Sequence, residues 1–422
     1  MAMIAAAVLA GGVAITACGD DDDDEAPAGE EASLELTIGD LVPLTGDFSD
    51  FGPPLQKAAD LAVDQIRAAI EETGADHEVD IVHEDTETSP QPGVQAARKV
   101  MVDGATCIPG AVASAVTIPV AESVTIPEGI LEITISTSDE ITGLDDDGLV
   151  NRITPPDSFQ GPALAEVLEQ DLGDAQGATV NVGARNDAYG TNLADTFSEA
   201  WEERGGEIGV RVDYDTELPA YDSEAAELVS GDPDRWVIID FPETYAKVGP
   251  ALVRTGEWDP ARTWSVDGLA SGSLPDDVGR EPTAGMRGTV PGAPEGEEAG
   301  REFNRLYEAA PGPGRQAFDS HNFDQVILCY LSAVAAGSTD GPQMAEQVRD
   351  VSGPPGTKYT FLELPEAIQA LQDGEDIDYE GVSGPIDMNE AGDTTAGVYD
   401  IWRFSEGKLE TFMQIPVAGE AQ

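Results

Sequence analysis

The sequence predicts an α/β protein of two lobes, each built on a central sheet of parallel strands. Short apolar runs of strand type alternate with segments whose apolar residues recur at helical spacing, which is typical of βαβ units. This alternation runs through the first part of the chain and starts again after Pro155 and Pro156. The chain has 422 residues, of which 41% are hydrophobic, enough for two or three domains with apolar cores.

The first part of the chain contains the first series of alternating elements. In chain order we expect a strand at 34–41, a helix at 55–70, a strand at 79–82, a helix at 89–102, a strand at 107–108, a helix at 114–124 and a strand at 130–135. The helix at 55–70 has the strongest pattern, because Leu55, Ala62 and Ile66 fall on one helical face. Strands joined by helices of this length lie parallel in one sheet.

The second series has the same pattern. We expect a helix at 158–172, a strand at 179–182, a helix at 190–204, a strand at 208–212, a helix at 224–230, a strand at 236–239, a helix at 245–255 and a strand at 263–266. Three more helices are expected at 297–309, 323–336 and 365–372. Strands at 398–404 and 408–412 flank residues 405–407, which is a hairpin signal. Two βαβ series in one chain predict two α/β lobes.

The N-terminal residues have the pattern of an export signal. Residues 3–17 carry no charge, and so short a stretch is typical of a signal core rather than a membrane-spanning helix. Cys18 follows small residues and precedes an acidic run, which resembles the lipobox of bacterial lipoproteins. The resemblance implies a signal peptide at 1–17 and a lipidated Cys18 anchored at the outer face of the cell membrane. Residues 18–33 would then form an acidic linker, able to reach roughly 50 Å.

Two other interpretations of the N-terminus are a plain signal peptide with an incidental cysteine and a buried apolar segment. The five consecutive aspartates at 20–24 do not belong in a core, which argues against the buried segment and leaves the plain signal peptide as the alternative to the lipoprotein.

The formal net charge of −61, from 82 acidic and 21 basic residues, limits the possible partners. Such a chain repels nucleic acid phosphates and anionic membranes, so we expect no nucleic acid partner. High net charge also favours disorder. Here the acids are interspersed with periodic apolar segments, which predicts a folded protein with a solvated acidic surface suited to salty or acidic surroundings.

The cysteines and histidines give no sign of a metal or catalytic site. Cys107 and Cys329 either form a disulfide, as is common outside the cell, or remain two buried thiols. The three histidines form no ligand cluster, and the sequence contains no zinc motif, no phosphate-binding loop and no Gly-x-Ser-x-Gly elbow. We therefore expect no metal, no cofactor and no enzyme activity.

Polar and aromatic residues follow several of the expected strands. In open parallel sheets, ligands bind beyond the carboxyl ends of the strands. The residues at these positions are Ser114, Ser136, Thr137, Tyr189, Tyr245 and Asp267. Hydroxyl groups at helix N-termini favour an anion and a carboxylate favours a cation, so the set suits a zwitterion such as an amino acid. Each residue alone also has an ordinary explanation, as a helix cap, a turn or part of the core.

Several short motifs resemble the solute-binding proteins of branched-chain amino acid ABC transporters, which have the type I periplasmic-binding-protein fold. The resemblance extends from about residue 36 to 412. It rests on the stretches 38–46, 84–86, 110–120, 187–190 and 383–386. In this order and spacing the motifs are specific to the fold more than to the ligand.

The resemblance implies a role for each candidate residue. Groups equivalent to Ser114, Ser136 and Thr137 hold the α-carboxylate, and the acid at Asp267 pairs with the α-ammonium. The remaining positions, Phe51, Tyr189 and Tyr245, match aromatic residues of the binding site. The family fold implies two Rossmann-like lobes joined by a three-stranded hinge, with crossings near Pro155, Pro291 and Gly384. Lobe I would comprise 34–155 plus 292–383, and lobe II 156–291 plus 384–422.

The resemblance implies a monomeric binding protein that delivers its small-molecule ligand to an ABC permease, with no chemical step. Three alternatives stay open. A ligand sensor of the same fold would report to a partner instead of a transporter. Relatives of the fold also bind amides, urea or aromatic acids. An extracellular hydrolase using paired carboxylates has little support, because 82 acids produce such pairs by chance.

Overall fold

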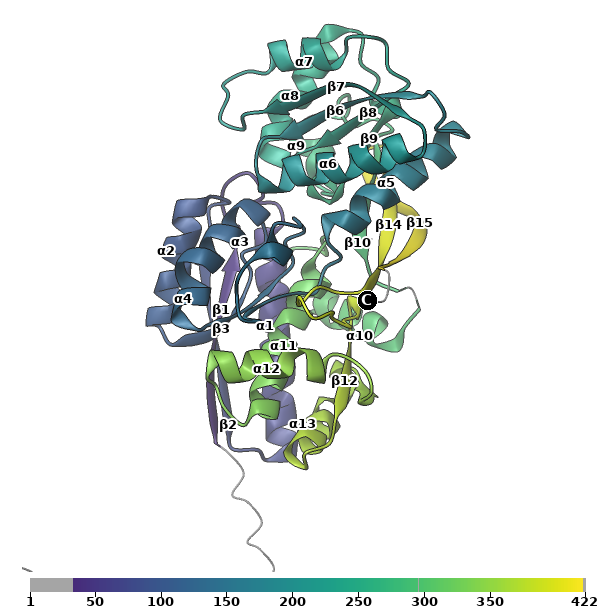
Figure 1. Ribbon diagram of the computed structural model, residues 1–422. Helices are drawn as coiled ribbons and strands as arrows, with labels where there is room; N and C mark the ends of the chain where they lie inside the picture. Colours follow the sequence, from purple (N-terminus) through teal and green to yellow (C-terminus); the bar gives the residue numbers. More distant parts are fainter. Residues whose placement is uncertain (1–32, 295, 420–422) are drawn as a thin grey trace, which may run out of the picture. The chain divides into compact units, whose positions relative to one another are not determined.

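The computed structural model describes residues 33–419 except residue 295. Within these residues the chain forms a two-lobe α/β fold, as the sequence predicts (Figure 1). One lobe is built on a five-stranded sheet and the other on a seven-stranded sheet, and we call them lobe I and lobe II. Cys18 and the expected signal and linker segments lie outside the described residues, apart from Ser33.

The sheet of lobe I is parallel throughout, in the order β2-β1-β3-β4-β5. Its strands are β1 (Leu34–Val42), β2 (His77–Asp85), β3 (Ala105–Pro109), β4 (Leu131–Thr134) and β5 (Val150–Arg152). The first helices are α1 (Gly52–Thr73), α2 (Pro90–Val102), α3 (Ser114–Val120) and α4 (Ile126–Glu128). Later segments complete the lobe with α10 (Glu298–Ala309), α11 (Asp319–Ala336), α12 (Gly341–Val351) and α13 (Leu364–Gln372).

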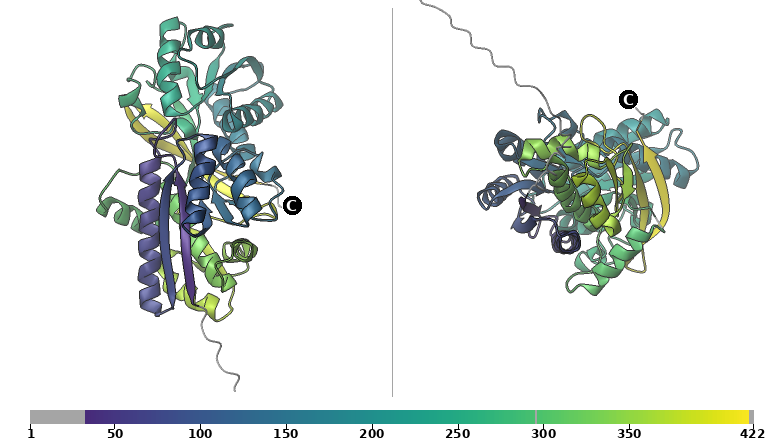
Figure 2. Two further views of the ribbon diagram at one scale, coloured as in Figure 1. Left: turned by 90° about the vertical axis from the view of Figure 1, so that its left-hand side faces the viewer. Right: turned by 90° about the horizontal axis from the view of Figure 1, so that it is seen from below.

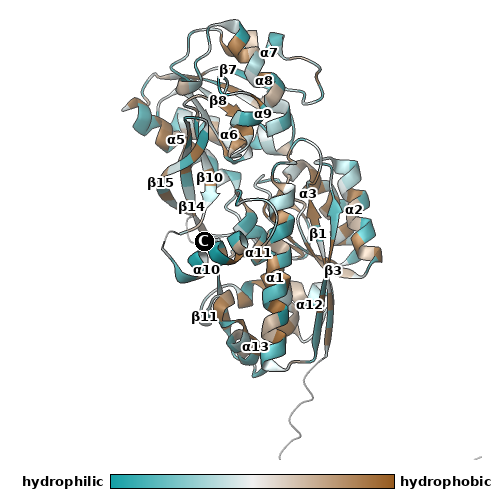
Figure 3. Ribbon diagram, turned by 180° about the vertical axis from the view of Figure 1, so that it is seen from behind, coloured by the Kyte–Doolittle hydropathy of each residue, from teal (hydrophilic) through white to brown (hydrophobic). Residues whose placement is uncertain are grey.

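Helices cover both faces of this sheet. α1 and α11 pack together, while α2 and α3 pack together on the other side (Figure 2). α1 begins with prolines at 53 and 54 and ends at Gly74, whose φ of 74° suits a left-handed C-cap. Figure 3 shows α1 alternating between hydrophobic and hydrophilic residues along its length, as its predicted amphipathic pattern requires.

The sheet of lobe II is mixed, in the order β15-β14-β10-β9-β8-β6-β7. Its strands are β6 (Thr179–Arg185), β7 (Glu207–Tyr214), β8 (Arg235–Ile239), β9 (Thr263–Ser265), β10 (Arg287–Gly292), β14 (Ala396–Ser405) and β15 (Lys408–Ala418). Its helices are α5 (Asp157–Leu172), α6 (Ala188–Glu203), α7 (Asp222–Leu228), α8 (Pro242–Thr255) and α9 (Leu274–Asp277). The antiparallel pairs are β10–β14 and β14–β15, so the parallel arrangement predicted for this lobe holds from β7 to β10.

The β14–β15 hairpin predicted from the sequence is present. Ser405 pairs with Lys408, and the two residues between them, Glu406 and Gly407, have φ angles of 53° and 77°. Positive φ at both central positions matches the right-handed twist of paired strands.

The chain passes between the lobes three times. β5 is followed by α5, β10 by α10, and β13 (Gly384–Pro385) by β14. β13 belongs to a small third sheet with β11 (Thr357–Tyr359) and β12 (Ile377–Gly381).

The segment predicted as a helix over 114–124 is helical, but it is not an α-helix throughout. α3 ends at Val120, and a π-helical turn (Ala121–Thr125) separates it from α4. Pro119 explains the break, because proline lacks a backbone N–H and crowds the preceding turn. The sequence analysis also missed β5, β10, α9, α12 and the third sheet, whose strands are only two to five residues long.

Cys107 of β3 and Cys329 of α11 form a disulfide with a Cα–Cα distance of 5.9 Å. It joins the central sheet of lobe I to a helix 222 residues later in the chain. Within residues 33–419, no helix combines the length and apolar character that crossing a membrane requires.

Candidate ligand-binding site

A small cavity lies where strand ends of both lobes meet. Its lining residues are Phe48, Val112, Ala113, Ser114, Ile135, Thr137, Tyr189, Phe241, Asp267 and Phe318. All but Phe318 follow the carboxyl end of a strand, namely β1, β3, β4, β6, β8 or β9. This is the edge at which parallel sheets bind their ligands.

Asp267 is the carboxylate among the lining residues, and the described lining contains no Lys, Arg or His. It follows β9 and is 3% exposed. Its Oδ1 accepts hydrogen bonds from Gln160 Nε2 at 2.8 Å and from the Tyr189 hydroxyl at 2.9 Å. Burial raises the pKa of Asp267 to about 6, and these two donors limit the rise. At neutral pH the cavity therefore offers an ionised carboxylate from lobe II.

Lobe I contributes hydroxyl groups to the same cavity. Ser114 begins α3, and its Oγ accepts a hydrogen bond from the Ser138 backbone at 3.2 Å. Thr137 follows β4, and its carbonyl accepts from the Asp157 backbone at 2.8 Å. These bonds hold the loop after β3 and the loop after β4 in fixed positions, so that both hydroxyl side chains reach the cavity lining.

Aromatic rings form a large part of the wall. Phe48 of lobe I and Phe241 of lobe II have centroids 4.3 Å apart, and Tyr189 stacks on Phe241 at 5.1 Å. The Arg185 guanidinium lies 3.8 Å from the Phe241 centroid. Aromatic contacts of this kind add to simple area burial. The wall of the cavity is therefore apolar and contains aromatic side chains from both lobes.

Two bulky lining residues have left-handed backbone conformations. Val112 has φ 75° and Phe318 has φ 70°. Such angles are unfavourable for side chains with a Cβ, most of all for β-branched ones, and they concentrate at binding sites. Packing by the surrounding structure therefore keeps Val112 and Phe318 in an unfavourable backbone conformation, with their side chains at the cavity.

Four of the seven ligand-binding residues predicted from the sequence line the cavity: Ser114, Thr137, Tyr189 and Asp267. Phe51 lies behind the lining and stacks on Phe48 with centroids 4.0 Å apart. Ser136 also lies behind it, because its Oγ donates to the Val112 carbonyl at 2.7 Å and contacts Thr117 Oγ1.

Tyr245 is not brought to the cavity. It packs in a separate apolar cluster of lobe II, where its hydroxyl donates to the Pro282 carbonyl at 2.7 Å. Tyr245 lies one turn into α8, and Phe241, at the N-terminal boundary of that helix, lines the cavity instead. The sequence analysis chose the wrong aromatic residue of this segment, because a position inside a helix can face either the site or the core.

The sequence analysis missed Phe48, Val112, Ala113, Ile135, Phe241 and Phe318. The strand-end rule could have found the first five, since each lies in a loop that follows a strand. No such signal marks Phe318, which precedes α11.

Direct contacts join the two lobes beside the cavity. Asp47 Oδ2 accepts hydrogen bonds from Arg185 at 3.2 Å and from Thr244 at 2.9 Å. Asp50 Oδ2 accepts from the Ser271 and Ser273 hydroxyls, both at 2.7 Å. These contacts between loops of different lobes give the structure a closed arrangement.

A second carboxyl, that of Asp157, is fully enclosed at the start of α5. Among the described residues, neither of its oxygens has a hydrogen-bond partner of normal geometry. Burial raises the pKa of Asp157 well above its usual range, and the neighbouring Thr137 side chain opposes the rise. Among the described residues, no group of His, Cys, Asp or Glu side chains is placed to hold a metal ion.

The sequence matches the periplasmic binding protein family over residues 35–401. It is 25% identical over 388 residues to the chemotactic signal transduction system substrate-binding protein BasB of Halobacterium salinarum, covering 90% of this chain and 89% of that protein. It is 26% identical over 398 residues to Leu/Ile/Val-binding protein homolog 3 of Brucella melitensis, covering 90% and 94%.

Solved structures share the fold. A leucine-binding protein LivK from Thermotoga maritima superposes with a TM-score of 0.74 at 22% identity, covering 90% of this chain and 98% of that one. A solute-binding protein of an ABC transporter from R. palustris, in complex with 4-hydroxybenzoate, gives a TM-score of 0.69 at 14% identity, covering 90% and 97%.

Proposed function

The chain belongs to the periplasmic binding protein family, and from that premise we propose that it is the extracytoplasmic solute-binding protein of an ABC importer. It captures a small zwitterion, an amino acid of the branched-chain type, between its lobes. The closed, loaded form then docks on a membrane permease and delivers the ligand. This cycle requires no chemical step.

The composition of the cavity carries this proposal. Lobe II contributes the buried carboxylate of Asp267, and lobe I contributes the hydroxyls of Ser114 and Thr137. A ligand with an ammonium at one end and a carboxylate at the other complements both lobes at once. Phe48, Phe241 and other apolar residues of the lining would pack against a hydrophobic side chain of the ligand. Because the ligand touches both lobes, it favours the closed form.

A thermal-shift screen with defined probes tests the proposal. L-leucine, L-isoleucine and L-valine should raise the melting temperature, since a ligand at a hundred times its Kd stabilises by about 2.7 kcal/mol. Leucinamide lacks the carboxylate and 4-methylpentanoate lacks the ammonium, so both should give smaller shifts. Stabilisation by benzoate or 4-hydroxybenzoate but by no amino acid would overturn the amino-acid assignment in favour of aromatic acids.

Asp267→Asn tests the proposed ammonium contact. The loss of one partner of a buried charge pair should weaken leucine binding by about 2–5 kcal/mol in calorimetry. Asp324→Asn is the matched control, because Asp324 is also fully buried with a pKa raised to about 6 by burial, but it contacts Tyr379 and Ser383 outside the cavity lining. Equal losses in both variants would argue against a contact between Asp267 and the ligand.

A second candidate function is ligand sensing, which the name of the BasB relative supports. A sensor would pass the same closed form to a signalling partner instead of a permease. Deletion of the gene distinguishes the two functions. If the protein serves an importer, the deletion strain should lose uptake of labelled leucine. If it serves a sensor, the deletion strain should keep this uptake and lose chemotaxis towards leucine.

We propose that the protein is anchored through a lipidated Cys18, which follows an uncharged stretch and precedes an acidic run. Mass spectrometry of the membrane fraction should then find a mature chain that begins at diacylated Cys18. A mature chain without lipid, recovered only in the soluble fraction, would contradict the anchor and leave the binding function untouched.

A further inference from the structure

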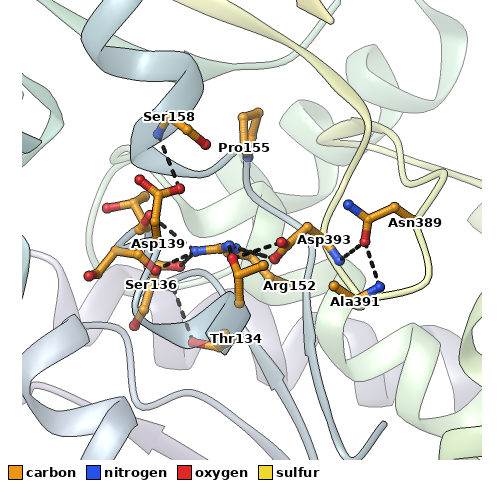
Figure 4. A network of polar contacts seen from close by, with 12 residues as sticks. Thr134, Ser136, Asp139, Arg152, Pro155, Ser158, Asn389, Ala391 and Asp393 are labelled. Atoms are coloured by element: carbon orange, nitrogen blue, oxygen red, sulfur yellow. Dashed lines mark hydrogen bonds and ion pairs between the residues drawn. The ribbon is translucent and has the colours of Figure 1, made fainter. Parts of the chain in front are cut away.

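Arg152 is a cation enclosed at the point where the last strand of lobe I ends. It closes β5, is 1% exposed, and lies three residues before Pro155. A buried guanidinium needs partners for its five N–H groups. Figure 4 shows that these partners come from two different directions.

On one side, the guanidinium holds the loop that follows β4. Nη1 donates to the carbonyl oxygens of Ser138 at 2.8 Å and Thr137 at 3.0 Å, with Ser136 at 3.4 Å (Figure 4). The Thr137 carbonyl also accepts from the Asp157 N–H at 2.8 Å and the Ser138 carbonyl from the Ile141 N–H at 3.2 Å, so the guanidinium adds to the donors that hold these residues. We call residues 136–138 the β4 loop. Because its carbonyls turn towards Arg152, the side chain of Thr137 is left on the cavity lining.

On the other side, the guanidinium holds the segment that leads into lobe II. Nε donates to Asp393 Oδ1 at 2.9 Å, and Nη2 donates to the same oxygen and to Thr142 Oγ1. The Arg152 backbone N–H donates to the Gly392 carbonyl at 2.7 Å, and Asp393 in turn donates its N–H to Asn389 Oδ1. This segment continues into β14 of the lobe II sheet.

We propose that Arg152 is a positioning residue for the ligand site, and that its pair with Asp393 couples the β4 loop to the third passage of the chain between the lobes. The role in ligand binding rests on the proposed function, since it assumes that Thr137 contacts the ligand carboxylate. The planar fork of arginine can hold carbonyls and a carboxylate together, which the point charge of lysine cannot.

The first test compares ligands in Arg152→Lys. L-leucine affinity should fall about tenfold or more, because hydrogen bonds to a charged group are lost. The preference for L-leucine over L-leucinamide should also narrow, since the displaced loop no longer recognises the carboxylate. A residue with only a structural role would leave this preference unchanged. Arg235→Lys is the matched control, because Arg235 pairs with Asp171 at 2.9 Å in lobe II and neither residue lines the cavity.

The second test needs no ligand. In Arg152→Lys, amide hydrogen exchange should become about tenfold faster in both 134–142 and 389–395, while β6 and β8 keep the wild-type rates. Asp393→Asn retains the shape of the side chain and serves if Arg152→Lys does not fold; it should accelerate the same two segments. Wild-type exchange in 134–142 in a folded variant would overturn the proposal, as would acceleration confined to one segment.

The two tests separate the possible failures. If the wild-type protein binds neither L-leucine nor L-leucinamide, the proposed function fails, and the exchange result still decides whether Arg152 couples the two segments. If leucine binds but its preference over leucinamide is the same in Arg152→Lys and Arg235→Lys, the positioning role fails and the proposed function stands.

Discussion

At the scale of single residues, the neighbours of Asp267 set both the pKa and the position of its carboxylate. Burial alone would favour the neutral acid, and the donors Gln160 and Tyr189 partly restore the ionised form. Gln160 also contacts Thr289 Oγ1 at 3.1 Å, so its amide is held from two sides. These hydrogen bonds hold the carboxylate in one position in the cavity lining.

Tyr189→Phe should weaken leucine binding by about 0.5–1.5 kcal/mol, because one hydrogen bond that orients Asp267 is lost. Tyr245→Phe provides the matched control. Its hydroxyl also makes a buried hydrogen bond, to the Pro282 carbonyl, but does not line the cavity. Calorimetry should therefore show weaker binding in Tyr189→Phe alone, while denaturation shows lower stability in both. Equal affinities in the two variants would contradict the orienting role of Tyr189.

At the scale of elements, the site is assembled from loops that follow strands. Each loop is short and is tied to the next one, as Ser138 is to Ser114 and Ser136 is to Val112. The strands themselves are held from behind. The disulfide between Cys107 and Cys329 fastens β3 to α11, and the loop after β3 begins at Gly110.

Replacement of both disulfide cysteines by alanine should lower the free energy of unfolding by up to about 5 kcal/mol, because the bond closes a loop of 222 residues in the unfolded chain. The expected measurement is a lower urea midpoint than for the oxidised wild type. Wild-type protein unfolded with reductant should match the variant, which controls for the lost packing of the two sulfur atoms. An unchanged midpoint in both would mean that the bond adds no stability.

At the scale of the whole molecule, charge is the dominant property. The net charge of −61 makes the surface strongly acidic, and several acids are also fully buried. Burial raises the pKa of Glu132 to about 8 and that of Asp240 to about 7. Between the two pKa values of each group, the folded state therefore binds a proton that the unfolded state has released. The contribution of these groups to stability is fully present below their pKa values in the unfolded chain, and it is lost as pH rises through their raised pKa values in the folded state.

The urea midpoint of the ligand-free protein should accordingly be higher at pH 5 than at pH 8. Part of this change comes from repulsion among surface acids, which salt screens, and part from buried acids, which salt affects much less. A pH dependence that persists in 1 M salt identifies the buried contribution; its complete loss in salt would assign the whole effect to the surface.

Glu132→Gln isolates one buried acid, because glutamine resembles the protonated side chain that accepts a hydrogen bond from Thr125. Above about pH 8 the variant should be more stable than the wild type, and below that pH the difference should shrink. The exposed Glu128→Gln is the matched control, and its stability relative to the wild type should not change with pH in this way.

The fold was largely predictable because its elements carry local signals. Apolar periodicity, caps and the hairpin turn identify most helices and strands, and short-range interactions decide them. One missed element, β5, is short and ends in Asn151 and Arg152, which take their strand conformation from pairing with β4 and with the segment at Asp393. The missed β10 and α12 are longer, with six and eleven residues. Four of the residues that line the cavity were also predictable, since parallel strands bring their carboxyl ends to one edge.

Local patterns in the amino-acid sequence establish the α/β class, the two series of strands, the acidic surface and the identity of the polar residues at strand ends. Which aromatic ring faces the cavity depends on the packing of the folded chain. Phe241 and Tyr245 lie four residues apart in one segment, and the packing of α8 on the lobe II core turns Tyr245 inward. Only the tertiary structure brought Arg152 to Asp393, because contacts between residues 241 positions apart depend on how the whole chain folds.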